Sequence, residues 1–165
     1  MGGPLKLCAR DEEDVSVISA CLQDALVSFA DVSFLPVRKR FVLVANRFKW
    51  ENCPDFPVES PAEAAGKPCT SYERVNCALC FDEVTGVRLA GLPSSEELKL
   101  LELLAITVER GDPEVGGKEA ESVVLHFAGG GSIHLDIGGI LCHLEDVGRP
   151  WRTDKRPCHP LDPEE

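Results

Sequence analysis

The apolar pattern of the chain predicts an α+β fold that is mainly antiparallel β, with about seven strands and one N-terminal helix. Most segments alternate apolar and polar residues with a period of two, which is typical of half-buried strands. One segment near the start repeats apolar residues at helical spacing instead. Short turn sequences separate most successive strands, so a curled sheet or a two-layer sandwich, closed by the helix, is the expected architecture.

The composition is that of one soluble domain. The chain has 165 residues, 44% of them hydrophobic and 27% charged, which suffices for a core without a disulfide or a metal. We expect a single domain over residues 1–150 and a loosely ordered, proline-rich tail over residues 151–165.

The charge and the N-terminal sequence limit the setting in which the protein acts. The net charge of −11 disfavours nucleic acid and anionic membranes as partners, and no apolar run approaches the length of a membrane span. The N-terminus lacks the apolar core of a signal peptide, so we expect a cytoplasmic protein whose eight cysteines are free thiols.

The helix is expected over residues 11–27. Asp11 is a suitable N-cap, and the acids that follow it suit the positive end of a helix dipole. One face then carries apolar residues at helical spacing, namely Val15, Ile18, Leu22, Ala25, Leu26 and Phe29.

A turn at residues 36–39 is expected to join a strand that includes Phe34 to a strand over residues 41–45. The second of these strands is apolar on both faces, which suits the centre of a sheet. The other strands outside the glycine-rich hairpin are expected over residues 4–9, 72–81, 87–92 and 103–110.

Three further predictions concern the pairing of two strands, the buried face of a third strand and a second helix. A turn at residues 82–86 would make a hairpin of the two strands beside it. In the strand that follows, Leu104, Ile106 and Val108 would share the buried face. Residues 140–147 fit a helix slightly better than a strand.

The best-specified element is the hairpin VVLHFAGGGSIHLDI over residues 123–137. A three-residue loop at 129–131 sets Phe127 opposite Ile133 and Leu125 opposite Leu135, so that one face is wholly apolar. Glycine readily supplies the left-handed residue that such loops require.

The same register places potential metal ligands on the exposed face of the hairpin. His126 is expected directly opposite His134, with Asp136 two residues further along the strand. Cross-strand neighbours have Cβ atoms about 5 Å apart, so these groups could bind a divalent metal or serve an enzyme. The structural alternative is a half-exposed sheet face that carries polar residues.

The cysteines offer a second possible metal site. Cys77 and Cys80 form a C-x-x-C pair, and Cys53 and Cys69 lie upstream, so four thiolates could hold zinc. On a strand, however, residues three apart point to opposite faces, and no predicted helix N-terminus is present there to activate a redox thiol. We therefore expect no cofactor, with zinc as the alternative.

A basic segment over residues 38–49 contains five cations and no acid. Its members are Arg38, Lys39, Arg40, Arg47 and Lys49, with Phe48 and Trp50 close by. Basic residues interleaved with aromatics could hold RNA or a phosphate. The alternative is a solvated turn whose cations pair with an acidic body.

Four stretches carry a family resemblance: ISACLQDALV, FLPVRKRFVLVANRFKWE, LLAITVE, and HFAGGGSIHL with the LEDVG that follows. Through them the chain resembles the bacterial family called domain of unknown function 2948, over roughly residues 5–151. The resemblance implies a small cytoplasmic single-domain protein and no established activity.

The resemblance also implies a place for a shared site. Asp24, Asn46, Arg47 and Trp50 lie in its hallmark stretches, so the site would form where that strand end meets the helix end. The structural alternative is that Asn46 and Arg47 cap the strand and pair with Asp24. With the basic turn included, the candidate ligand-binding residues are Asp24, Arg38, Arg40, Asn46, Arg47 and Trp50.

A well-patterned sheet without a recognisable catalytic motif favours a non-enzymatic binding or adaptor module. It would bind an unidentified protein, or itself, through an exposed sheet edge or the basic strand. The alternatives are a metal protein or enzyme that uses His126, His134 and Asp136, and an RNA or phosphate binder that uses residues 38–49.

Overall fold

A computed structural model describes residues 3–52, 72–92, 100–111, 121–155 and 157. In chain order the elements are β1 (Lys6–Ala9), α1 (Glu12–Cys21), β2 (Ala25–Leu35), the 3-10 helix η1 (Pro36–Arg38), β3 (Arg40–Phe48), the 3-10 helix η2 (Trp50–Asn52), β4 (Tyr72–Phe81), β5 (Val84–Ala90), β6 (Leu101–Arg110), β7 (Glu121–Phe127), β8 (Ser132–Ile137) and β9 (Cys142–Thr153).

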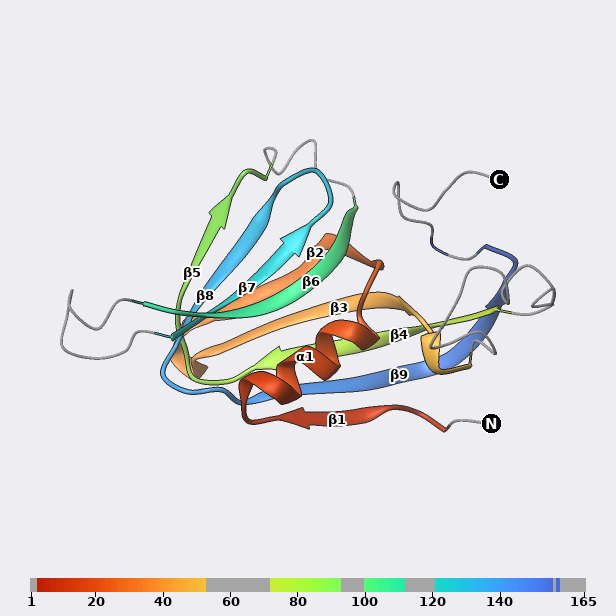
Figure 1. Cartoon of the computed structure of the whole chain (residues 1–165), viewed down its shortest axis with the longest axis horizontal. Coiled ribbons are helices and arrows are strands. Elements are labelled where there is room, and N and C mark those ends of the chain that lie inside the picture. Colours follow the sequence, from red (N-terminus) through yellow and green to blue (C-terminus); the bar gives the residue numbers. More distant parts are fainter. Residues whose placement is uncertain (1–2, 53–71, 93–99, 112–120, 156, 158–165) are drawn as a thin grey trace.

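The strands form one open antiparallel sheet in the order β1-β9-β4-β3-β2-β6-β7-β8-β5. The predicted class, mainly antiparallel β with one N-terminal helix, is confirmed, although the described residues form nine strands rather than about seven. A register shift between Val27 and Val32 interrupts the pairing of β2 with β3. The sheet curls, and α1 lies in its hollow, in contact with β6 in one half and β1 in the other (Figure 1).

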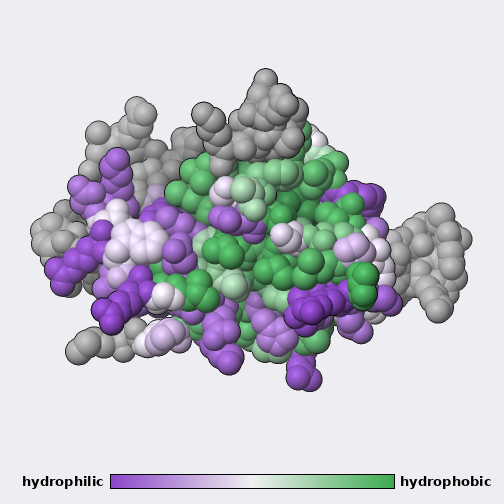
Figure 2. Space-filling model, turned by 180° about the vertical axis from the view of Figure 1, so that it is seen from behind, coloured by the Kyte–Doolittle hydropathy of each residue, from purple (hydrophilic) through white to green (hydrophobic). Residues whose placement is uncertain are grey.

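The core fills the space between α1 and the inner face of the sheet. Val15 and Ile18 of α1 and Leu22 just after it are buried against alternate residues of the strands, such as Leu43 and Leu79. Seen from behind, the outer face of the sheet is also apolar over much of its middle (Figure 2). Among the described residues, no helix is long and apolar enough to cross a membrane.

The helix is shorter than predicted. Asp11 caps it as expected, because its carboxylate accepts a hydrogen bond from the Asp14 N–H at 2.8 Å. The helix ends at Cys21, and Asp24 then adopts a left-handed φ of 63° and donates its N–H to Leu103. Ala25 and the residues after it therefore join β2, because pairing with β6 satisfies their backbone groups.

The predicted register of the β7–β8 hairpin was wrong by two residues. Gly129 and Gly130 are left-handed, and the Phe127 N–H donates to the Gly131 carbonyl, so the loop is 128–130. Leu125 therefore lies opposite Ile133 rather than Leu135. A slip of two residues keeps every side chain on its face, so the buried face is the one predicted.

Two topological predictions were also wrong. β5 pairs with β8 and not with β4, so Asp82 and Glu83 lead into a strand at the far edge of the sheet, and residues 82–86 do not close a hairpin. Residues 140–147 are not helical, because β9 lies between β1 and β4 and both its edges are paired. β9 also continues past residue 150 to Thr153.

A bulge in β6 explains one further error, which concerns the buried face of that strand. The pairing with β7 shifts between Leu103 and Ala105, which changes the face on which later residues lie. Leu103 and Ile106 are buried, whereas Leu104 is exposed. The turn at residues 36–39 is confirmed as η1, after which Lys39 has a left-handed φ of 51°.

Candidate functional site

The inner face of the central strands is apolar until the end nearest η2, where it becomes charged. On β3 the buried residues Phe41, Leu43 and Ala45 are followed, at the same period of two, by Arg47. On β9 the buried Leu144 is followed by Asp146 in the same way. Alternation thus carries a cation and an anion onto the face that the core occupies.

Arg47 reaches Asp146 across an intervening strand. β4 lies between β3 and β9, so the two backbones are about 10 Å apart. The neighbouring side chains are small, since Ala45 lies opposite Cys77 and Cys77 lies opposite Asp146. The guanidinium donates from Nε to Asp146 Oδ1 at 2.7 Å and from Nη2 to Oδ2 at 2.8 Å.

Glu51 of η2 completes the cluster from the other side. It accepts from Arg47 Nη1 at 3.0 Å and from Nη2 at 2.7 Å, so two carboxylates hold one guanidinium. The Arg47 and Asp146 side chains are 0% and 2% exposed, whereas that of Glu51 is 38% exposed. A second anchor fixes Asp146, because its Oδ2 accepts from the Leu5 N–H at 2.8 Å.

The pairing shifts the pKa values of all three groups. Burial works to raise the pKa of Asp146, but hydrogen bonds from Arg47 and the Leu5 N–H outweigh it, and the pKa is lowered. Glu51 follows the same pattern, and its pKa is also lowered. Burial works to lower the pKa of Arg47, yet the two carboxylates raise it. The cluster is therefore fully ionised near neutral pH, with one negative charge in excess.

Trp50 joins the end of β3 to the end of α1. Its Nε1–H donates to the Gln23 carbonyl at 3.0 Å, just beyond the helix. Its ring meets Phe48 edge-on, with the centroids 4.7 Å apart. The strand end and the helix end therefore do meet, as the resemblance implied for a shared site.

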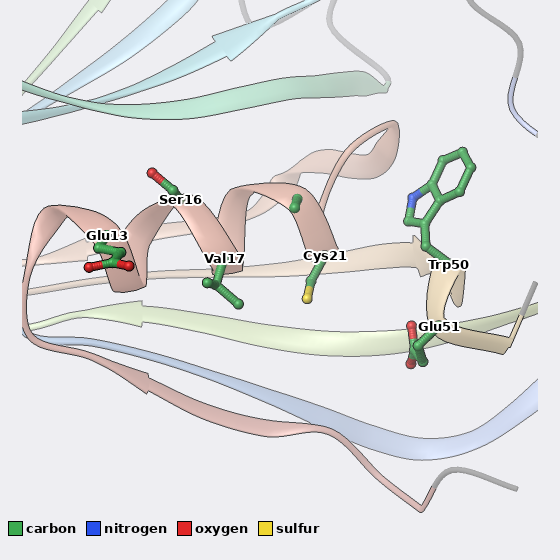
Figure 3. A pocket seen from close by; sticks show the side chains of 7 residues that line it. Glu13, Ser16, Val17, Cys21, Trp50 and Glu51 are labelled. Carbon is green, nitrogen blue, oxygen red and sulfur yellow. The ribbon is translucent and has the colours of Figure 1, made fainter. Parts of the chain in front are cut away.

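A groove of about 420 Å3 opens beside these contacts. We call it the α1–η2 groove; its lining residues are Glu13, Ser16, Val17, Ala20, Cys21, Trp50 and Glu51. Val17 and Cys21 project from the same side of α1, and Trp50 and Glu51 stand at the far end (Figure 3). Burial raises the pKa of the Cys21 thiol, although Arg47 opposes the shift, so the thiol is neutral and adds to the apolar lining.

The groove combines an apolar middle with acidic ends. Val17 is 53% exposed, so it offers apolar surface that the fold leaves uncovered. Glu13 lies at one end of α1, and Glu51 lies on η2 beside Trp50. Such a site suits an apolar group with a cation nearby, and none of its described lining residues is an activated nucleophile.

The structure does not bring the six predicted ligand-binding residues together. Arg47 binds Asp146 and Glu51, whereas the structural alternative had paired it with Asp24. Asn46 lies on the outer face, where its Oδ1 accepts from Arg74 at 3.0 Å. Trp50 is the one predicted residue that lines the groove.

The other two lie far from the groove. Arg38 belongs to η1, before β3, and Arg40 binds Asp82 at 2.8 Å. Lys49 is buried 3.5 Å from Glu73. With Arg47 also buried, the basic segment forms no continuous basic surface over the described residues, which removes the geometric basis of an RNA site there.

The predicted metal cluster is not assembled either. His126 lies opposite Ser132 and His134 opposite Val124, so the two imidazoles are not direct neighbours. His126 Nε2 lies 2.8 Å from the Thr107 hydroxyl, and Asp136 binds Arg88 at 3.1 Å. Within the described ranges, no three His, Cys, Asp or Glu residues are grouped so that they could hold a metal ion.

The C-x-x-C pair lies on a strand, as expected. Cys77 is buried on the inner face of β4, whereas Cys80 is partly exposed on the outer face. Cys53 and Cys69, the other two proposed zinc ligands, lie outside the described residues.

Sequence reasoning missed Glu51, Asp146 and the groove-lining residues of α1. A signal for Glu51 was present, since it follows Arg47 by four residues with opposite charge. Asp146 carried no such signal, because it is 99 residues away from Arg47 along the chain.

A comparison with protein-family models gives one match. The model described as "Protein of unknown function (DUF2948)" matches residues 5–159. No curated protein and no solved structure matches the chain. The functional assignment must therefore come from the site itself.

Proposed function

We propose that this chain, which belongs to the DUF2948 family, is a non-enzymatic binding module. Its α1–η2 groove receives an apolar side chain from a partner protein, and basic residues beside that side chain face the acidic ends of the groove. The observation that carries the proposal is the exposed apolar lining of the groove between Glu13 and Glu51.

Hydrophobic burial would supply the affinity. Val17, Ala20 and the neutral Cys21 thiol line one wall, and Trp50, which is 9% exposed, adds the part of its side chain that reaches the groove. Covering such surface is favourable by about 25 cal/mol per Å2 before the costs of association.

Charge would select the partner. The helix carries Glu12, Glu13 and Asp14 in its first turn and no basic residue along its length. Because the body of the protein is also acidic, the groove repels acidic segments and attracts basic ones.

The groove is held ready for a ligand by fixed contacts. Glu51 is bound twice by Arg47, and Trp50 is fixed to the end of the helix through Gln23. A wall that is already ordered loses little conformational entropy when a ligand binds.

Peptide binding tests the proposal directly. Fluorescent peptides with one Leu flanked by Lys and Arg, and matched peptides with the Leu flanked by Glu, would be titrated with the full chain and followed by anisotropy. We expect only the basic peptides to bind. Val17→Glu should weaken them by about tenfold or more, which equals ~1.4 kcal/mol.

Leu89→Glu is the matched control. Leu89 is 54% exposed and Val17 is 53% exposed, but Leu89 lies on β5 at the edge of the sheet, away from the groove. Its replacement should leave peptide binding unchanged. Equal binding of acidic and basic peptides, or binding that Val17→Glu does not weaken, would show that the groove does not have this function.

A further inference from the structure

The turn between β2 and β3 presents the most exposed large apolar side chain of the described residues. Val37 is 98% exposed at the tip of η1, with Leu35 40% exposed two residues before it. Pro36 restricts the backbone at the start of the turn, and Lys39 closes it with a left-handed φ. We call residues 35–39 the η1 turn. A contact that covered this apolar tip would be favoured by the hydrophobic effect.

The η1 turn is also basic. Arg38 and Lys39 follow Val37, and neither forms an ion pair with any residue that the structure describes. Arg40 is different, since Asp82 already neutralises it. The turn therefore offers an apolar side chain with two uncompensated cations beside it, on a chain whose net charge is −11.

We propose that the partner of the α1–η2 groove is the η1 turn of a second copy of this chain, an inference that rests on the proposed function. Val37 enters the groove beside Val17 and Trp50, while Arg38 and Lys39 face the acids at its ends. The two surfaces are opposite in charge and alike in being apolar at the centre, which is the complementarity that the groove requires.

The turn cannot reach the end of its own groove that Trp50 and Glu51 form. η1 precedes β3 and η2 follows it, and β3 is 9 residues long. At roughly 3.3 Å per residue, η1 lies about 30 Å from η2, which carries Trp50 and Glu51, at the opposite end of β3 (Figure 1). The contact must therefore form between molecules.

A contact between two different surfaces is heterologous. After one contact forms, one molecule keeps a free turn and the other keeps a free groove, so copies add head to tail until a ring closes or an open chain grows. A symmetric dimer through the apolar outer face of the sheet would behave differently, because it uses one surface twice (Figure 2). This difference makes the inference testable.

The test uses two variants that each remove one half of the contact. Val37→Asp alters the turn and Val17→Glu alters the groove; both side chains are exposed, so both variants should fold, as circular dichroism would verify. Sedimentation velocity of the untagged full chain would be measured over a range of concentrations. We expect the unaltered chain to form species larger than a dimer as its concentration rises, and each variant alone to remain at the monomer mass of 17.9 kDa.

Mixing the variants decides the geometry. An equimolar mixture retains one intact turn and one intact groove, so it should form a heterodimer of twice the monomer mass and nothing larger. Added salt should weaken this heterodimer, because opposite charges are screened. Leu89→Asp, as a control, should assemble like the unaltered chain.

Three results would overturn the inference: a chain that stays monomeric at every concentration, assembly that survives either variant, and a mixture that fails to form the heterodimer. A peptide of residues 34–40, titrated separately, distinguishes a failure of self-association from a failure of the groove to bind basic apolar segments. If it binds the groove while the chain stays monomeric, the groove recognises basic apolar segments of another protein. If the peptide does not bind the groove and the chain does not self-associate, the groove is not a docking site.

Discussion

Replacing Arg47 by Met should lower the free energy of unfolding by more than the loss of any exposed ion pair between described residues would. The Arg47 side chain is wholly buried and donates four hydrogen bonds of 2.7–3.0 Å to Asp146 and Glu51. Methionine fills a similar space without a charge, so the variant leaves Asp146 buried without its cation. Removing one partner of a buried ion pair typically costs about 3–5 kcal/mol.

The two carboxylates do not share this cost equally. Glu51 is 38% exposed and can turn toward water, which compensates for much of its loss. Asp146 is 2% exposed and keeps only the Leu5 N–H. Most of the expected 3–5 kcal/mol therefore comes from Asp146, and the double variant Arg47→Met, Asp146→Asn should cost less than the sum of the two single changes.

The pH dependence has a defined sign. In the unaltered protein the folded pKa values of Asp146 and Glu51 lie below their ordinary values of 3.8 and 4.5. Their stabilisation is therefore present above those values and is lost as the pH falls through the lower, folded values. In Arg47→Met, burial still works to raise the pKa of Asp146, and only the Leu5 N–H and the charge of Lys49 oppose it. The pKa is therefore higher than in the unaltered protein, and the penalty of the buried carboxylate decreases as acid protonates it. The difference between the two proteins should shrink from neutral pH toward pH 4.

Urea unfolding followed by tryptophan fluorescence, near pH 7 and near pH 4, measures both effects. Arg88→Met is the control, because it removes an exposed pair with Asp136 and should cost less than about 1 kcal/mol. The reasoning fails if Arg47→Met costs no more than Arg88→Met near pH 7, or if its cost is the same at both pH values.

Three further outcomes are expected. Leu103→Ala should lower the free energy of unfolding by about 2–5 kcal/mol and Leu104→Ala by less than ~1 kcal/mol, because the β6 bulge buries the first and exposes the second; the reverse order in urea unfolding would contradict the bulge. Burial raises the pKa of Cys77 to about 12, so iodoacetamide near neutral pH should alkylate the exposed Cys8 and spare Cys77, and equal labelling by peptide mass mapping would argue against the burial. Gly129→Val should cost about 1–2 kcal/mol, since a β-branched residue is strained at a φ of 91°, and an unchanged thermal midpoint would refute the placement of the loop.

Local chemistry accounts for the elements that the sequence predicted well. The N-cap at Asp11, the turn at Pro36 and the alternation from Val75 to Phe81 each depend on neighbours within a few residues. The family resemblance also pointed to the meeting of the strand end with the helix end, where Trp50 donates to the Gln23 carbonyl. Predicting these features required no information about tertiary contacts.

The end of the helix needed more than local chemistry. Ala25 and Leu26 continue an apolar pattern that suits a helix as well as a strand, so periodicity alone extends the helix to residue 27. Hydrogen bonding with β6 makes these residues a strand. It gives the backbone groups of Asp24 and the residues after it hydrogen-bond partners that the end of an isolated helix lacks.

Except at the β6 bulge, the sequence by itself determined which face the residues of the predicted strands occupy, whereas the tertiary structure decided which residues face one another. A period of two is unchanged by a slip of two residues, so the pattern buried the right side of the β7–β8 hairpin yet set His126 opposite the wrong residue. For Arg47, too, the pattern gives the face of the strand but not the partner. Alternation placed it on the inner face of β3, but Asp146 became its partner only because β4 inserts between β3 and β9. Strand order is a property of the whole packed sheet, and no local pattern encodes it.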